Sequence, residues 1–144
     1  MILVDVNLLL YAYDDRSPHQ AAAAKWLEDA FDSEDVIGIA ATTIVTFVRL
    51  STDPRVFGSA LTTDAAVATI DAIVALDNVT LVVPGPRHYS ILREVLLASR
   101  ATRNLVPDAA LAALAIEHGG TIATNDRDFD RFRGAKVIYP LETR

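Results

Sequence analysis

Three aspartates lie in or beside apolar segments, where an ionised carboxylate is costly. Asp5 interrupts the apolar run that opens the chain, and Asp126 follows a second apolar run. Asp108 falls on the predicted buried side of a helix over residues 107–118. A carboxylate near a core needs a hydrogen-bond partner, a cation or a metal. One divalent metal ion bound by all three aspartates is a simpler explanation than a separate stabilising partner for each of them.

Each aspartate also has an ordinary structural explanation. Asp108 could stabilise a helix N-terminus, where negative charge is favourable. Asp126 could form a turn in the segment 125–128. Asp5 is harder to explain in this way, because a strand end between Val4 and Val6 rarely needs an acid. The functional interpretation therefore depends on the three residues together.

Apolar spacing and the positions of proline and glycine predict alternating strands and helices. Strands are predicted over residues 2–5, 36–40, 79–83, 121–124 and 136–139. Helices are predicted over residues 19–31, through 44–48 and ending before 53, over 63–74, over 87–100 and over 107–118. This alternation indicates an α/β fold with a parallel sheet covered by helices on both faces.

The predicted topology offers a place where the three aspartates meet. In open α/β folds, ligands bind beyond the carboxyl ends of the strands, where the strand order reverses. Asp5 and Asp126 each end a predicted strand, and Asp108 lies in the first turn of a helix that would begin at the same edge. The fold class therefore predicts one acidic site at this edge of the sheet.

Length and composition set limits on the class of protein. A chain of 144 residues predicts one domain over residues 1–144, and 51% apolar residues predict a folded one. The absence of cysteine excludes disulfides and thiolate metal sites. The chain contains neither a recognisable signal peptide nor an apolar stretch long enough to span a membrane. We therefore expect a cytoplasmic protein without membrane association.

The net charge of −6 argues against a general nucleic-acid binder. Lys25 and Lys136 are the only lysines, so nearly all basic residues are arginines, which bind phosphate in a bidentate manner. Among them we expect Arg49, Arg103 and Arg127 to contact a phosphate-containing substrate. The other arginines are expected to be solvated surface charges.

Several motifs together resemble those of PIN-domain ribonucleases, and within them the VapC toxins of bacterial toxin–antitoxin pairs. The motifs are residues 5–7, 105–115 and 124–129, with further likeness over 47–57 and 84–88. Each motif alone is weak, but their order and spacing are specific and extend over about residues 2–140. The resemblance implies a three-layer α/β/α fold around a central, mostly parallel sheet of four to five strands.

The resemblance also implies roles for individual residues. Asp5, Asp108 and Asp126 match the family's catalytic, metal-binding acids, and Asp128 matches a further acid that often lies nearby. Asn7 matches a polar residue that commonly lines the site and is expected to contact substrate.

Thr46 departs from the family pattern. It stands where most relatives have a glutamate, although the branch that this chain resembles often lacks that glutamate too. The departure puts occupancy of a second metal site in question.

An oxygen-rich acidic site of this kind suits Mg²⁺ or Mn²⁺. Such an ion polarises a phosphoryl oxygen and lowers the pKa of a bound water, which predicts hydrolysis of RNA phosphodiester bonds. The resemblance implies the toxin of a type II toxin–antitoxin system, held by a VapB-like antitoxin across the active-site groove and forming a homodimer. Apolar side chains after Asp5 agree with a partner surface: Leu8, Leu9, Leu10, Tyr11 and Tyr13.

Two other classes of function remain open. Thr46 and the acidic net charge are compatible with a catalytically silent binding module of the same fold. Asp5 after the first strand is compatible with a haloacid-dehalogenase-like phosphatase, but that class needs a second aspartate where this chain has Asn7. A phosphoaspartate receiver is also disfavoured, because no acid pair with a downstream lysine is evident.

Overall fold

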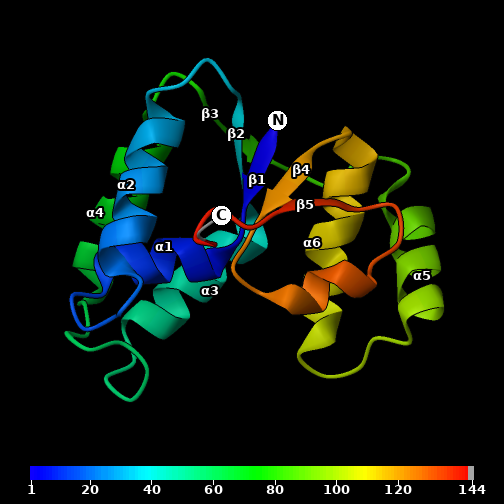
Figure 1. Ribbon diagram of the computed structural model, residues 1–144. Coiled ribbons are helices and arrows are strands. Elements are labelled where there is room, and N and C mark those ends of the chain that lie inside the picture. The colour runs from blue at the N-terminus through cyan, green and yellow to red at the C-terminus, as the bar shows by residue number, and fades with distance from the viewer. Residues whose placement is uncertain (143–144) are drawn as a thin grey trace.

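The computed structural model describes residues 1–142 of the chain. Five strands form one parallel sheet in the order β3-β2-β1-β4-β5 (Figure 1). The strands are β1 (Ile2–Val4), β2 (Ile37–Ala40), β3 (Val79–Val82), β4 (Thr121–Ala123) and β5 (Lys136–Ile138). The helices are α1 (Val6–Tyr13), α2 (Gln20–Phe31), α3 (Ala41–Ser51), α4 (Thr63–Val74), α5 (His88–Ser99), α6 (Leu105–His118) and the 3-10 helix η1 (Arg127–Arg131).

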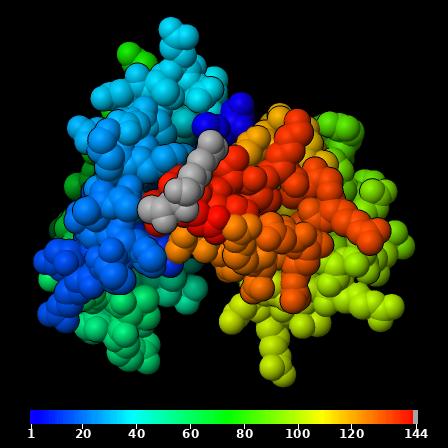
Figure 2. All heavy atoms as spheres, viewed as in Figure 1, coloured from blue at the N-terminus to red at the C-terminus, as the bar shows by residue number. Residues whose placement is uncertain are grey.

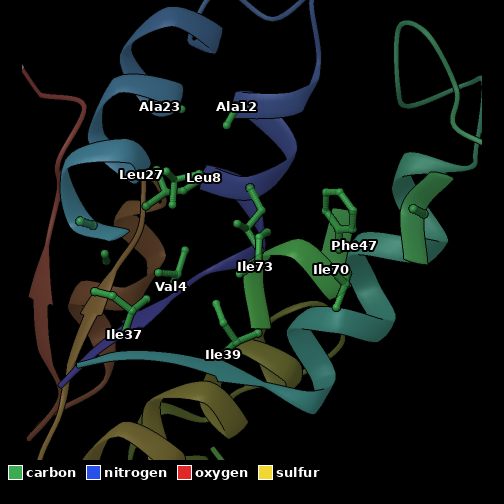
Figure 3. Packing of buried hydrophobic residues seen from close by; sticks show 14 residues of the cluster. Val4, Leu8, Ala12, Ala23, Leu27, Ile37, Ile39, Phe47, Ile70 and Ile73 are labelled. Atoms are coloured by element: carbon green, nitrogen blue, oxygen red, sulfur yellow. The ribbon is translucent and has the colours of Figure 1, made fainter. Parts of the chain in front are cut away.

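The sheet separates two apolar cores, which makes a three-layer α/β/α fold (Figure 1). Successive side chains of a strand point to opposite faces, so Val4 packs among α1 to α4 and Leu3 packs among α5, α6 and η1. Figure 3 shows the first core, where Ile37 and Ile39 of β2 lie close to side chains of the surrounding helices. The predicted fold class and its number of strands are confirmed.

The structure differs from the predicted elements at three places. α1 begins directly after Asp5, and η1 follows Asp126; neither helix was predicted with its bounds. α6 begins at Leu105, earlier than predicted, so Pro107 lies inside the first turn. A proline is tolerated there because the amide that it lacks would have no partner within the helix.

The strand order reverses between β1 and β4. From β1 the chain proceeds outward to β2 and β3, and then crosses to β4 on the other side of β1. Parallel α/β sheets form a crevice at such a point, beyond the carboxyl ends of the strands. Figure 2 shows the surface hollowed on the lower side of the view, between the teal-green segment that follows α3 and the yellow-green segment that precedes α6.

The apolar residues after Asp5 belong mainly to the protein's own core. Leu8 and Leu9 are fully buried, Leu10 and Tyr11 are half-buried, and only Tyr13 of this group is exposed. The sequence-based argument for a partner surface on α1 is therefore limited to Tyr13 and the half-buried residues beside it. Among the described helices, none combines the length and the apolar character that a transmembrane segment needs.

Candidate active site

Asp5 is the buried acid at the centre of the site, with 7% of its surface exposed. Its backbone amide donates to the Ala123 carbonyl at 2.9 Å, which extends the pairing of β1 with β4 by one residue. Its Oδ1 accepts from the Val6 amide at 2.7 Å and so caps α1. Its Oδ2 accepts from Thr124 Oγ1 at 2.7 Å and from Asn7 Nδ2 at 2.8 Å. These bonds fix the orientation of the carboxylate. Oδ1 accepts one hydrogen bond and Oδ2 accepts two, so Oδ1 has more lone-pair capacity left for another ligand.

Thr124 is a residue of the site that sequence reasoning did not assign. Its buried hydroxyl donates to Asp5 Oδ2 and accepts from Asn7 Nδ2 at 3.1 Å and from the Asp126 amide at 3.0 Å. One hydroxyl group therefore ties the end of β1 to the end of β4. The available sequence signal was a hydroxyl residue at the end of an apolar strand, two positions before an aspartate.

We expect Thr124→Val to weaken both folding and activity. Valine keeps the shape of the side chain but leaves the Asn7 and Asp126 donors without this acceptor, which costs about 2 kcal/mol of unfolding free energy. Loss of a group that orients a ligand typically lowers metal affinity or activity about 10–100-fold. Thermal unfolding and metal titration test this, with Thr124→Ser as the control that retains the hydroxyl. A valine variant with unchanged metal affinity would contradict the orienting role.

Asp126 and Asp128 lie at the start of η1, beyond the end of β4. Asp126 Oδ1 accepts from the Asp128 amide at 2.8 Å and caps the helix, as the turn-forming explanation predicted. Asp126 is half-buried and Asp128 is exposed. Capping occupies one acceptor position of Asp126, and its other carboxylate oxygen accepts no hydrogen bond within residues 1–142.

Asp108 lies in the first turn of α6 and is half-buried. Burial, together with the negative charges of Asp5, Asp126 and Asp128, raises its pKa to about 6, and burial is the largest cause. Burial also raises the pKa of Asp5, against the opposing hydrogen bonds from Thr124 and Val6, and the charge of Asp126 adds to the increase. The predicted acids thus share one region and repel one another, which favours binding of a cation.

A small cavity of about 80 Å³ connects Asp5 with Asp108. Polar groups from α3 also face it, and the complete lining is Asp5, Val6, Thr42, Thr43, Thr46, Pro107, Asp108 and Leu111. Thr46 therefore lies beside the acids and offers them a hydroxyl group. The α3 wall contributes hydroxyl groups and no negative charge.

The donor set suits a hydrated hard cation. Every candidate ligand is a carboxylate or hydroxyl oxygen, and no hydrogen bond within residues 1–142 occupies the Asp108 carboxylate. In the same part of the chain, no three His, Cys, Asp or Glu side chains are arranged to enclose one ion. Mg²⁺ often binds through one or two carboxylates while it keeps several waters. Asp5 and Asp108 could therefore hold such an ion without a closed cage of protein ligands.

Two of the polar residues expected to contact substrate, Arg127 and Asn7, already interact with other side chains of the protein. The Arg127 guanidinium contacts Asp130 and Glu142 and lies 3.9 Å from the centre of the Tyr139 ring. Asn7 donates to Asp5 and Thr124 and accepts from the Asn125 amide at 3.3 Å, so its whole amide group is used within the site.

Arg49 and Arg103 are both exposed. Arg49 lies in the last turn of α3, and Arg103 precedes α6. Arg103 has a backbone φ of 52°, a left-handed conformation that few non-glycine residues adopt. Neither guanidinium forms an ion pair within the described chain, unlike that of Arg127.

Comparison with known proteins agrees with this architecture. The family model described as "PIN domain" matches residues 2–135. Ribonuclease VapC37 of Mycobacterium tuberculosis is 39% identical over 140 residues, which cover 97% of each chain. Ribonuclease VapC25 of the same organism is 33% identical and covers 97% of this chain and 99% of its own. The crystal structure of VapBC2 from Rickettsia felis, bound to a DNA fragment from its promoter, superposes with a TM-score of 0.71 at 15% identity and covers 96% of this chain and 98% of its own.

Proposed function

Because the chain belongs to the PIN domain family, we propose that it is a metal-dependent endoribonuclease and the toxin of a type II toxin–antitoxin pair. The relatives over nearly the full chain are named ribonucleases, and structural neighbours come from VapBC complexes. The observation that carries the chemistry is the group of mutually repelling carboxylates at the switch point between β1 and β4. Residues 1–144 would form a single domain of this family.

Each residue of the site has a distinct part in the proposed reaction. Asp5 and Asp108 would be the principal ligands of Mg²⁺ or Mn²⁺, and Asp126 would be a further ligand or would position water, with Asp128 beside it. The bound ion would supply charge stabilisation at the phosphate and a more acidic water. Thr124 and Asn7 keep the Asp5 carboxylate in one orientation. Arg49 and Arg103 would contact the RNA backbone, whereas Arg127 would mainly stabilise η1 against Tyr139.

A cleavage assay with purified protein tests the proposal. We expect the wild-type protein to cut RNA in the presence of Mg²⁺ or Mn²⁺ and to lose this activity when a chelator is added. The Asp5→Asn variant should lose at least about a hundredfold in rate, because its neutral amide binds a cation more weakly. Circular dichroism would verify that the variant is folded. Metal-independent cleavage, or a folded Asp5→Asn protein that cuts as fast as wild type, would contradict the assignment.

An apolar groove of about 320 Å³ between α1, α2 and the end of α4 suits the proposed antitoxin partner. Tyr13, Leu27, Phe31 and Leu76 contribute its apolar walls, while Glu28 and Asp32 also line it. This pattern would accept an amphipathic segment that carries apolar and basic side chains. A second segment of the same partner would lie across the acidic site and block it.

A second copy of this chain is also a proposed partner, and the cytoplasm is the proposed location. The location agrees with a chain that contains no cysteine. Sedimentation of the toxin alone tests the dimer, since a protein that remains monomeric at micromolar concentration would contradict it.

A further inference from the structure

A second cavity, of about 130 Å³, adjoins the acidic site. It lies between the junction of β2 with α3, the end of β3, the start of α5 and the middle of α6. Thr42 lines both this cavity and the one that contains Asp5 and Asp108. A ligand group in the second cavity would therefore lie next to any phosphate bound at the acids.

The lining of the second cavity is mainly apolar. Apart from Thr42 and His88, its walls are alanine, valine, leucine and proline side chains. Thr42 and Pro84 are exposed, so the cavity is open to solvent on that side. An apolar cavity of about 150 Å³ can hold a benzene ring. A single six-membered ring therefore matches this cavity in size, and the fused double ring of a purine exceeds it.

His88 is held at this cavity by a buried carboxylate. Its Nδ1 is buried without a hydrogen-bond partner in the described chain and lies 3.9 Å from Glu117 Oε1. Glu117 is itself buried, with 6% of its side chain exposed, and its Oε1 accepts from the Gly85 amide at 2.6 Å. A carboxylate beside Nδ1 favours the tautomer with the proton on that nitrogen. The other ring nitrogen, Nε2, is then a hydrogen-bond acceptor for a ligand.

Gly85 permits this arrangement. A Cβ atom at position 85 would lie 3.1 Å from Glu117 Oε2, closer than most real contacts. The same carboxylate is also near His118 Nε2, at 3.9 Å, but that nitrogen is 2.9 Å from the Val83 carbonyl. His88 is therefore the imidazole with an unengaged Nδ1 that the buried glutamate can orient.

We propose that the second cavity binds the pyrimidine base of a nucleotide adjoining the scissile phosphate. This inference rests on the proposed ribonuclease function and adds a base preference to it. Proteins read single-stranded RNA through unstacked bases that enter such cavities and form hydrogen bonds there. His88 Nε2 would accept from N3–H of uracil or from the exocyclic amine of cytosine. The ribose would then place the neighbouring phosphate beside the cation that Asp5 and Asp108 would hold.

A pool of RNAs with a randomised segment tests the base preference. We expect the wild-type protein with Mn²⁺ to cut bonds that have a pyrimidine on one fixed side, with about tenfold preference over a purine. Ala110→Leu would fill the cavity from α6 and remove the preference, whereas Ala98→Leu on the exposed side of α5 would retain it. If Ala110→Leu fails to fold, Ala41→Leu at the exposed side of the cavity replaces it.

The outcomes separate this inference from the proposed function. A pool that the wild-type protein leaves uncut contradicts the ribonuclease itself. Cleavage without a pyrimidine preference, or with a preference that survives in the cavity-filling variant, overturns only the base cavity. A measurement independent of cleavage is the NMR signal of the His88 ring during titration of the Mg²⁺-containing protein with uridine monophosphate. The signal should shift in wild type and Ala98→Leu but not in Ala110→Leu, and an unchanged wild-type signal overturns the inference.

Discussion

Asp108→Asn is expected to abolish RNA cleavage while making the metal-free protein more stable. The carboxylate of Asp108 is half-buried and lies in the field of Asp5, Asp126 and Asp128, which raises its pKa to about 6. An amide removes this repulsion but no longer attracts a cation. We expect the cleavage rate to fall by about a thousandfold or more. At neutral pH the free energy of unfolding should rise by about 1 kcal/mol, after allowance for solvent screening.

The matched control for this substitution is Asp64→Asn. Asp64 also lies in the first turn of a helix, α4, but it is exposed and does not line the cavity that contains Asp5 and Asp108. Loss of a favourable first-turn charge should slightly destabilise that variant, by about 0.5 kcal/mol, without affecting cleavage. An Asp108→Asn protein that is destabilised to the same extent would show that Asp108 acts mainly as a helix-stabilising charge.

The stability that Asp108→Asn gains over the wild-type protein should depend on pH. The pKa of Asp108 is raised from 3.8 in the unfolded chain to about 6 in the folded protein. Between these two pH values the folded protein therefore binds more protons than the unfolded chain does. Stability of the metal-free protein therefore falls as the pH rises from about 4 to about 6 and changes little above that range. The raised pKa of Asp5 contributes in the same direction. The difference between wild type and Asp108→Asn should accordingly disappear below about pH 4.

The second large effect is expected from metal binding. Mn²⁺ at about one hundred times its dissociation constant should stabilise the wild-type protein by about 2.7 kcal/mol, because the ion binds the folded state alone. This gain should decrease as the pH falls below about 6, since protons compete with the ion for the same carboxylates. Thermal unfolding at several pH values, with and without Mn²⁺, measures both trends.

Asp108→Asn and Asp64→Asn are the comparison proteins for metal binding as well. The first should lose most of the Mn²⁺-dependent stabilisation, and the second should retain all of it. Equal stabilisation of the three proteins by Mn²⁺ would place the ion elsewhere on the molecule, and the proposed assignment of Asp5 and Asp108 as ligands would be wrong.

The alternation of apolar runs and helical spacing was sufficient to predict the fold class from the sequence. Strands β1, β2 and β4 are short, mostly buried runs, the edge strands β3 and β5 are short and partly exposed, and most helices carry a distinct apolar face. α1 was not delimited because Leu8, Leu9 and Leu10 form a continuous apolar run without visible helical spacing. Its start depends on the Asp5 carboxylate, which caps the helix and also belongs to the acidic site.

The identities of the acidic residues were readable in the sequence because charges are rare within apolar segments. Their shared location depends on the strand order, which places β1 beside β4 across more than one hundred intervening residues. No local pattern specifies that pairing, because it results from the way in which the two apolar cores close on opposite faces of the sheet.

The role of Thr124 and the cavity beside Thr42 and His88 were decided by tertiary structure alone. A threonine that ends a strand has the same local pattern whether its hydroxyl meets water or three polar partners. Likewise, His88 and Glu117 are far apart along the chain and come together only through the packing of α5 on α6. The sequence by itself determined which elements form and which charges are costly, because both follow from short-range patterns of apolar residues. Tertiary structure decided which side chains share a cavity, because that depends on contacts between distant segments.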